Sequence, residues 1–173
     1  CVVSIGSCPR SCNVFKGSYS VEGPLEKYTH VDVSIAGCTP KPEAIIEGLY
    51  KAAEILADSD GIVVASPVYY ASANGTLISF LDRLFYSCKC DKRMKVGASV
   101  AVARRGGCSA TYDELNKYFT INHMPVAPSQ YWNSVHGKTP GEAAKDEEGM
   151  QTMRTLARNM SFLMKSIELG KEK

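Results

Sequence analysis

The sequence has no apolar run that approaches the length needed to cross a bilayer, and nothing at its start has the pattern of a signal peptide. It also has no marked excess of one charge. Its 20 basic and 18 acidic residues give a formal net charge of +2, and the basic residues are dispersed. We therefore expect a cytoplasmic protein with no membrane insertion and no nucleic-acid partner.

The sequence also lacks a disulfide framework and a dinucleotide-binding motif, which limits the cofactors and metal sites that we expect. The seven cysteines are an odd number that does not suggest a secreted disulfide framework, so we expect thiols or metal ligands in a reducing compartment. No G-x-G-x-x-G follows a predicted strand, which argues against a dinucleotide cofactor. Cys88-Lys89-Cys90 has no second cysteine pair and is predicted to be an exposed turn rather than a zinc site. Cys108 is predicted to be a packed small residue, and the three histidines have no metal-site spacing.

What the sequence does contain is an alternation of β-branched apolar runs with segments of helical periodicity. Its 173 residues, 45% of them apolar, predict a single domain over 1–173. The predicted strands are 2–5, 31–35, 62–65, 96–102 and 126–130, and the predicted helices begin near Pro42, Gly75, Thr111 and Asp146. Right-handed crossovers place helices on both faces of a parallel sheet. We predict a three-layer α/β/α, flavodoxin-like fold with a five-stranded parallel sheet of order 2-1-3-4-5.

Two local patterns give finer expectations. Thr111 and Glu114 have the spacing of a capping box at a helix start. The last predicted helix, from Asp146 to Leu169, carries a stripe of methionines, which we interpret as core packing.

Three polar loops, residues 6–13, 66–75 and 103–107, each follow a predicted strand. The carboxyl ends of parallel strands meet at one edge of a sheet, where ligands bind, so the loops are expected to converge. Such loops suit a planar cofactor with a phosphate tail, and FMN fits better than a dinucleotide. An ordinary glycine and serine turn remains the alternative for the first loop. The candidate cofactor-binding residues are Ser7, Arg10, Ser11, Asn13, Ser66, Pro67, Val68, Tyr69, Tyr70, Asn74, Gly75, Ala103, Arg104, Arg105, Gly106 and Gly107.

Within these loops, different residues suit different parts of such a cofactor. The hydroxyls and backbone N–H groups around Ser7 and Ser11, with Arg10, suit a phosphate. Tyr69 or Tyr70 could cover a ring face, and the two glycines of residues 106–107 let backbone approach closely.

The back of the chain resembles the flavodoxin-like NAD(P)H-dependent FMN reductases. The matching segments are S-P-V-Y-Y-A-S-A-N-G-T-L-I-S-F-L-D-R, A-R-R-G-G, Y-F-T-I-N-H-M-P-V and S-Q-Y-W-N, and the resemblance covers about 53–173. It implies that residues 66–70, 74–75 and 103–107 border the isoalloxazine ring, and that Asp82 and Arg83 are structural. It also implies FMN as cofactor, NAD(P)H as co-substrate, a small-molecule electron acceptor and a homodimer.

The front of the chain, about 1–50, resembles the iron-sulfur small subunit of complex I and of membrane-bound nickel-iron hydrogenases. The matching segments are V-V-S-I-G-S-C, Y-S-V-E-G-P-L-E-K-Y, V-D-V-S-I and A-G-C-T-P-K-P-E-A-I-I-E-G-L. In that family two such cysteines, here Cys8 and Cys38, are ligands of a four-iron four-sulfur cluster. The other two ligands of the family have no counterpart in the matched segment, and Cys12 is a candidate recruit.

Three hypotheses remain open. The first is an FMN-binding oxidoreductase that passes electrons from NAD(P)H to a small acceptor, with no side chain required as acid or base. The second is an iron-sulfur electron-transfer module that uses Cys8 and Cys38 with Cys12. The third is a chimeric scaffold, recombined or engineered, that holds no cofactor. Of these we favour the flavin, and thiols over a cluster.

Overall fold

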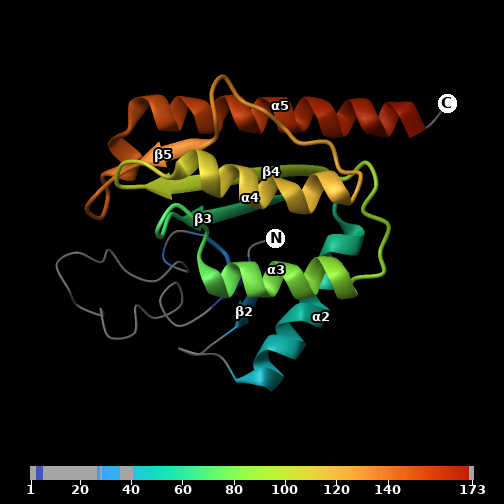
Figure 1. Ribbon diagram of the computed structural model, residues 1–173. Helices are drawn as coiled ribbons and strands as arrows, with labels where there is room; N and C mark the ends of the chain where they lie inside the picture. Colours follow the sequence, from blue (N-terminus) through green and yellow to red (C-terminus); the bar gives the residue numbers. More distant parts are fainter. Residues whose placement is uncertain (1–2, 6–26, 28, 36–40, 172–173) are drawn as a thin grey trace. The chain divides into compact units, whose positions relative to one another are not determined.

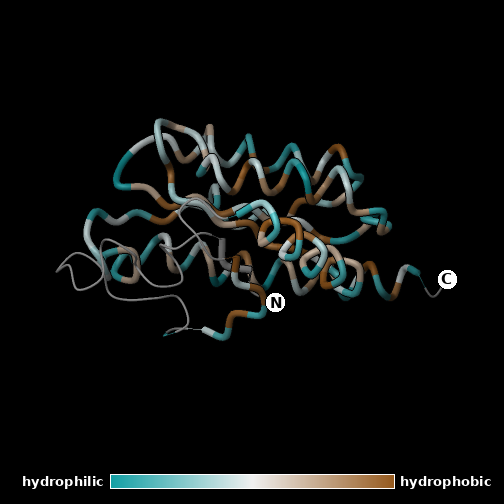
Figure 2. The backbone as a smooth tube through the Cα atoms, turned by 90° about the horizontal axis from the view of Figure 1, so that it is seen from below, coloured by the Kyte–Doolittle hydropathy of each residue, from teal (hydrophilic) through white to brown (hydrophobic). Residues whose placement is uncertain are grey.

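The computed structural model describes residues 3–5, 27, 29–35 and 41–171 (Figure 1). The chain divides into two compact units, which are described separately: one comprises Cys1–Asp58 and Thr76–Cys90, and the other Ser59–Gly75 and Asp91–Lys173. No helix in the described part of the chain is long and apolar enough to span a membrane. In Figure 2 the helices alternate between hydrophilic and hydrophobic colour along their length, as amphipathic helices do.

The first unit contains a two-stranded parallel sheet of β1 (Val3–Ile5) and β2 (Val33–Ile35), with the helices α2 (Pro42–Asp58) and α3 (Gly75–Ser87). Proline at the first position of α2 lacks only an N–H that would have no partner inside the helix, as the sequence predicted. Ile35 is buried, and a Cβ at Gly48 of α2 would overlap the Ile35 side chain. Glycine therefore lets α2 lie close against β2.

The second unit contains the strands β3 (Gly61–Pro67), β4 (Val96–Ala103) and β5 (Ser134–His136), which pair in parallel in the order β3-β4-β5. Its helices are α4 (Cys108–Ile121), the short η3 (Ala143–Lys145) and α5 (Glu147–Lys171). The parallel pairings of β1 with β2, and of β3, β4 and β5, agree with the predicted order. The pairing of β1 with β3 stays a prediction.

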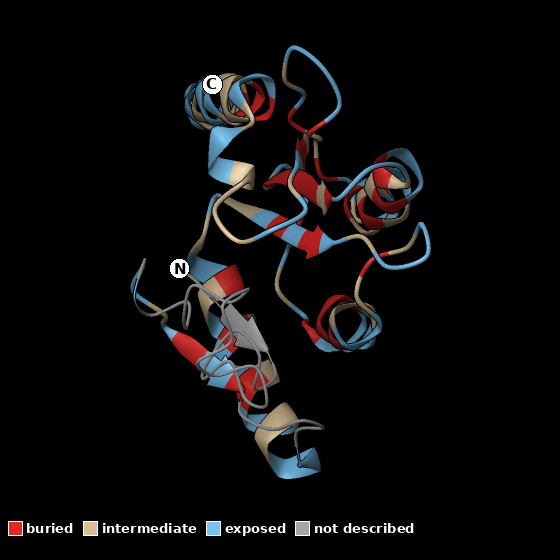
Figure 3. Ribbon diagram, turned by 90° about the vertical axis from the view of Figure 1, so that its left-hand side faces the viewer, coloured by how far each residue is buried: buried red, intermediate tan, exposed pale blue. Residues whose placement is uncertain are grey.

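The alternation of side chains along β4 places α4 and α5 on opposite faces of this sheet, and β4 is almost wholly buried (Figure 3). On one face Val96, Ala98 and Val100 pack with Leu156 of α5, and Met153, Met160 and Met164 are among the side chains packed against that cluster. On the other face Ser99 Oγ donates to Asn116 Oδ1 of α4 at 2.7 Å. The predicted packing role of the methionine stripe is confirmed for these three residues.

The fifth strand lies later in the chain than predicted. Val126 makes one isolated bridge with Gly97, and Ala127 N–H donates to Gly97 O at 2.8 Å. Pro128 has no N–H for a next ladder bond, so the chain leaves the sheet and rejoins it at Ser134. The prediction of a strand over 126–130 is therefore wrong, and the strand is Ser134–His136.

The predicted capping box is also wrong. The helix α4 begins at Cys108, with Gly107 at its N-cap, so Thr111 lies inside the helix and is fully buried. Glu114 instead bonds to a loop of the same unit. The three-residue spacing of Thr111 and Glu114 fits both a capping box and the arrangement found here, so spacing alone could not distinguish them.

Candidate functional site

The loop after β3 is closed by the hydroxyl of Ser66. This buried side chain accepts the N–H of Asn74 at 2.8 Å and donates to its neighbour Pro67 O at 2.8 Å. One hydroxyl thus joins the two ends of the loop, so the predicted residues 66–70 and 74–75 belong to one closed structure.

The tip of this loop is a tight turn. Tyr69 and Ser72 exchange two backbone hydrogen bonds, at 2.9 and 3.1 Å, and the two residues between them, Tyr70 and Ala71, have φ of 52° and 61°. Two left-handed residues at the centre of a two-residue loop are the pattern of a type I′ turn. The turn leaves Tyr69 and Tyr70 exposed, with the Tyr70 side chain fully in solvent.

Glu114 of α4 fixes this loop from the side. Its Oε2 accepts the N–H of Ala73 at 2.9 Å and the hydroxyl of Ser72 at 2.9 Å. Ala73 itself is buried. One carboxylate of α4 therefore accepts two hydrogen bonds from this loop and fixes its position against the helix.

The loop after β4 meets the first loop at Gly107. Val68 N–H donates to Val102 O at 2.9 Å, which extends the ladder between the two strands beyond Pro67. Gly107 has φ of 96°, and a Cβ there would lie 2.9 Å from Val68 Cγ1 and 3.0 Å from Ala71 Cα. Only glycine combines this conformation with this close approach. The structure thus brings two of the three predicted loops together at the carboxyl edge of the sheet.

The surface around this junction is open and carries backbone donors. A Cβ added at Gly106 or at Gly75 would meet no atom within 4 Å, and Arg104 and Arg105 are exposed. Gly107 caps α4 without a side-chain hydrogen bond, and the first N–H groups of a helix have no partner inside it. Donors at the start of α4 are therefore available to a polar ring edge or an anion.

A third group at this edge was not expected from the sequence. Cys108 Sγ lies 3.8 Å from His136 Nε2, and Asp146 Oδ2 lies 3.8 Å from His136 Nδ1 and accepts the His136 N–H at 2.7 Å. Cys108 is buried as predicted, and burial raises the pKa of its thiol. Hydrogen bonds from Gly149 N–H and His136 N–H lower the pKa of Asp146. Cys108 comes after β4, whereas His136 ends β5 and Asp146 precedes α5, so no sequence spacing could have joined the three.

The remaining predicted residues lie outside the described part of the chain. These are Ser7, Arg10, Ser11 and Asn13 of the predicted phosphate loop, and the proposed cluster ligands Cys8, Cys12 and Cys38. Among the residues that the structure describes, no group of three or more histidine, cysteine or acidic side chains could hold a metal ion.

A parallel sheet with helices on both faces, and with loops joined at its carboxyl edge, defines a flavodoxin-like α/β protein. The profile of the NADPH-dependent FMN reductase family matches residues 25–139, and the chain belongs to this family. The match begins ahead of the boundary near residue 53 that the sequence predicted. The chain is accordingly a flavoprotein oxidoreductase, and its cofactor is FMN.

Relatives that match much of the chain include iron-sulfur flavoproteins. An iron-sulfur flavoprotein of Methanocaldococcus jannaschii is 30% identical over 132 residues, which are 72% of this chain and 68% of the relative. Two others match a shorter segment. A probable membrane-bound hydrogenase subunit of Pyrococcus furiosus is 45% identical over 56 residues, and an NADH-quinone oxidoreductase subunit of Anaeromyxobacter is 44% identical over 55. Each of these matches covers 32% of this chain and about a third of the relative.

Solved structures support the fold. The Trp repressor binding protein from Bacillus subtilis aligns with a TM-score of 0.55 at 14% identity, over 79% of this chain and 83% of its own. An NADH:FMN oxidoreductase in its apo form aligns with a TM-score of 0.53 at 19% identity, over 95% and 88%. At such identities the likeness shows the flavodoxin-like fold alone.

Proposed function

We propose that the two joined loops bind the isoalloxazine ring of FMN and that the protein passes electrons from NAD(P)H to a small acceptor. The observation that supports this most directly is the junction at Gly107, where the loop after β4 touches Val68 and Ala71 of the loop after β3. Loops joined at the carboxyl edge form one wall, and a flat ring needs a continuous wall with backbone donors. Residues 66–70, 74–75 and 103–107 would border the ring.

In this proposal the chain binds and orients, and FMN supplies the hydride and electron chemistry. The exposed ring of Tyr69 is available to cover one face of the bound group and to exclude water from it. Backbone N–H groups at the start of α4 would donate to the polar edge of the ring. Arg104 and Arg105 would add positive charge beside it, which suits an anionic co-substrate.

Titration of the purified full chain with FMN, followed by flavin fluorescence, tests the ring site. Gly107→Ala adds a Cβ against Val68 and Ala71 at a positive φ, which would force the two loops apart. We therefore expect the FMN affinity to fall by about tenfold, which is ~1.4 kcal/mol of binding free energy. Gly170→Ala, with open space around it in α5, is the matched control. Protein that takes up no FMN, or a Gly107→Ala variant with unchanged affinity, would contradict the proposal.

NAD(P)H as the reductant is tested on the same preparation. We expect the absorbance of bound FMN near its visible maximum to bleach when NADH or NADPH is added without oxygen, and to return when a small quinone acceptor follows.

We also propose a homodimer, which cross-linking or light scattering tests. The pairing of β1 with β3, which would complete the order 2-1-3-4-5, belongs to the same proposal because the family fold requires it.

A second candidate function is iron-sulfur electron transfer. It is favoured by the matches to a hydrogenase subunit and to an NADH-quinone oxidoreductase subunit, and by an iron-sulfur flavoprotein among the relatives. We expect bound iron, if Cys8 and Cys38 are ligands, to disappear in a Cys38→Ser variant while FMN uptake remains. Iron-free protein after anaerobic reconstitution would exclude this candidate.

A further inference from the structure

The connection after α3 places two thiols side by side. Cys88 Sγ and Cys90 Sγ are 2.8 Å apart, although the sequence predicted only an exposed turn here. Cys88 is in fact buried, with 8% of its surface exposed, whereas Cys90 is half-buried. The prediction that both residues lie in an exposed turn is therefore wrong for Cys88.

Local structure fixes the buried thiol. Cys88 N–H donates to Leu84 O at 3.0 Å and so continues the hydrogen bonding of α3 by one residue. Its Sγ lies 3.9 Å from Ala53 O of α2 in the same unit. These contacts fix the Cys88 side chain, and Cys90 is the more exposed of the two residues.

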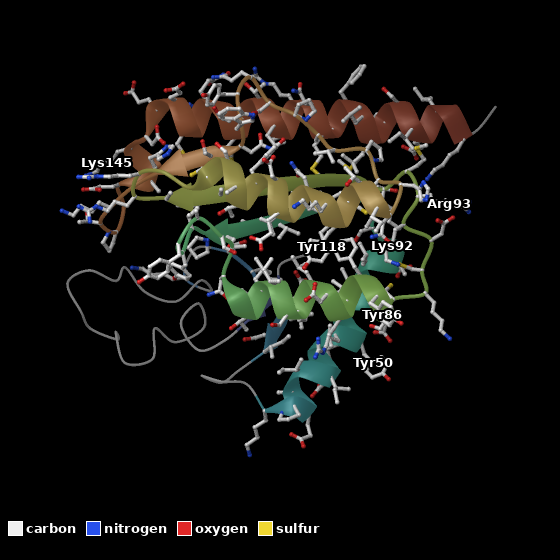
Figure 4. All side chains as sticks on the ribbon, viewed as in Figure 1. Tyr50, Tyr86, Lys92, Arg93, Tyr118 and Lys145 are labelled. Atoms are coloured by element: carbon white, nitrogen blue, oxygen red, sulfur yellow. The ribbon has the colours of Figure 1, made fainter. Side chains whose placement is uncertain are left out.

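An open groove of about 1090 Å³ runs between α2 and α3 in this unit. Its lining ends at Cys88 and Lys89, so Cys90 follows the groove directly in the chain. Tyr50 on α2 and Tyr86 on α3 stand at the groove and are both largely exposed (Figure 4). Its charged lining consists of Arg83 and Lys89, both exposed, against one carboxylate, Asp82. The groove thus has aromatic walls, a net positive charge and room for a molecule of several hundred Å³.

We propose that Cys88 and Cys90 are a redox-active dithiol that reduces a small, carboxylate-bearing disulfide bound in this groove. The accessible sulfur of Cys90 attacks one sulfur of the bound disulfide, which forms a mixed disulfide and releases one small thiol. Cys88 then attacks Cys90 Sγ, which forms the Cys88–Cys90 disulfide and releases the second thiol. Two protein thiols are oxidised, one external disulfide is reduced, and the two protons pass to the two leaving thiolates.

The short spacing argues for a redox role rather than a structural one. A disulfide stabilises a fold mainly through the loop that it closes, and a bond between residues 88 and 90 closes almost none. Bonds of this kind are readily reduced, so the pair can pass between dithiol and disulfide, and an excess of the external disulfide drives its oxidation. The positive charge of Lys89, between the two cysteines, favours whichever thiolate forms.

The test uses the reduced full chain, an excess of glutathione disulfide as the probe and mass analysis of a chymotryptic peptide that spans both cysteines. In the wild type we expect that peptide to lose two hydrogens and to carry no glutathione. Recovery of both cysteines as alkylatable thiols, or a lasting glutathione adduct on the wild-type peptide, would overturn the proposal.

Two variants separate the roles of the sulfurs. Cys88→Ala removes the resolving thiol, so a stable glutathione adduct is expected on Cys90, whereas Cys90→Ala should lose the reaction. An unmodified Cys90 in the Cys88→Ala protein, with its urea midpoint retained, would contradict the assignment. Cys88 is buried, so Cys88→Ala could fail to fold. In that case the wild-type measurement and the Cys90→Ala variant, at a half-buried position, still test the proposal. Cys108 of the same digest is the internal control and should stay a thiol without glutathione.

Discussion

Glu114 Oε2 lies 2.9 Å from Ala73 N and 2.9 Å from Ser72 Oγ, so one carboxylate of α4 accepts two hydrogen bonds from the loop after β3. The loop and the helix are 41 residues apart in the chain at this contact. Hydrogen bonds to a charged acceptor are about twice as strong as neutral ones, and a half-buried donor left without an acceptor is costly.

The first prediction removes this acceptor. Glu114→Ala should lower the free energy of unfolding by about 1.5–3 kcal/mol, because Ala73 N–H loses its partner in a buried position. We also expect weaker FMN binding, since the loop that would border the ring is no longer fixed. Urea unfolding and FMN titration measure the two effects. Asp113→Ala, which removes the same charge from an exposed site on the same helix, should change neither.

The second prediction concerns the buried hydroxyl of Thr111. Its Oγ1 has no hydrogen-bond partner within the described structure, and the residue is fully buried. Thr111→Val keeps the shape and removes the unpaired polar atom, so we expect the free energy of unfolding to rise by ~1 kcal/mol or more. Thr120→Val at an exposed site, where Oγ1 donates to Lys117 O, should not raise it. A loss of stability in Thr111→Val would show that the hydroxyl does have a partner.

The third prediction concerns the contact between β4 and α4. A Cβ at Gly97 would overlap the ring of Phe119, which is fully buried. Gly97→Ala should therefore cost about 1–3 kcal/mol of stability through overpacking, as measured by the urea midpoint. Phe119→Leu in the same chain should recover part of this loss in a double-mutant cycle. Purely additive effects would contradict the contact.

The fourth prediction follows from Asp146, which precedes α5. Its Oδ1 accepts Gly149 N–H at 3.0 Å, the position of an N-cap bond, and its Oδ2 accepts His136 N–H. Asp146→Ala should lower the free energy of unfolding by about 1–2 kcal/mol at neutral pH. Removal of Glu148, an exposed acid in the first turn, should cost less.

The pH dependence of this effect has a definite sign. These hydrogen bonds lower the pKa of Asp146 in the folded chain below its usual 3.8. The carboxylate therefore contributes its stability above the unfolded pKa and loses it as the pH falls through the folded value. We expect the difference between wild type and Asp146→Ala to be constant above about pH 5 and to shrink below pH 4. A difference that persists unchanged at pH 2 would exclude the ionised cap.

Periodicity in the sequence was enough for the helices, for the order of the elements and for four of the five strand positions. It failed at Val126, where apolar residues resemble a strand but Pro128 prevents the ladder from continuing. It also failed at Thr111, because a capping box and a buried helical threonine can share the same local sequence. Local patterns cannot report which long-range partner a residue finds.

The candidate site was likewise predictable from the sequence only in part. That residues 66–75 and 103–107 converge was predictable, because parallel strands end at one edge of a sheet. The direct contact between the two loops was not predictable, because it depends on Gly107 lying against Val68 and Ala71 at a positive φ. The contacts among Cys108, His136 and Asp146, and the depth at which Cys88 lies, require three-dimensional packing that no spacing encodes.

We expect amino-acid substitutions to accumulate at different rates on the two faces of β4. Towards α4, Gly97 leaves no room for a Cβ beside Phe119, and Ser99 is bonded to Asn116, so few other side chains fit at these positions. Towards α5, methionines fill the space, and their unbranched, flexible side chains adapt to changes in neighbouring volume. One face of β4 thus supports α4, the helix that holds the loop after β3, and tolerates little change. Substitutions can accumulate on the other face without moving that loop.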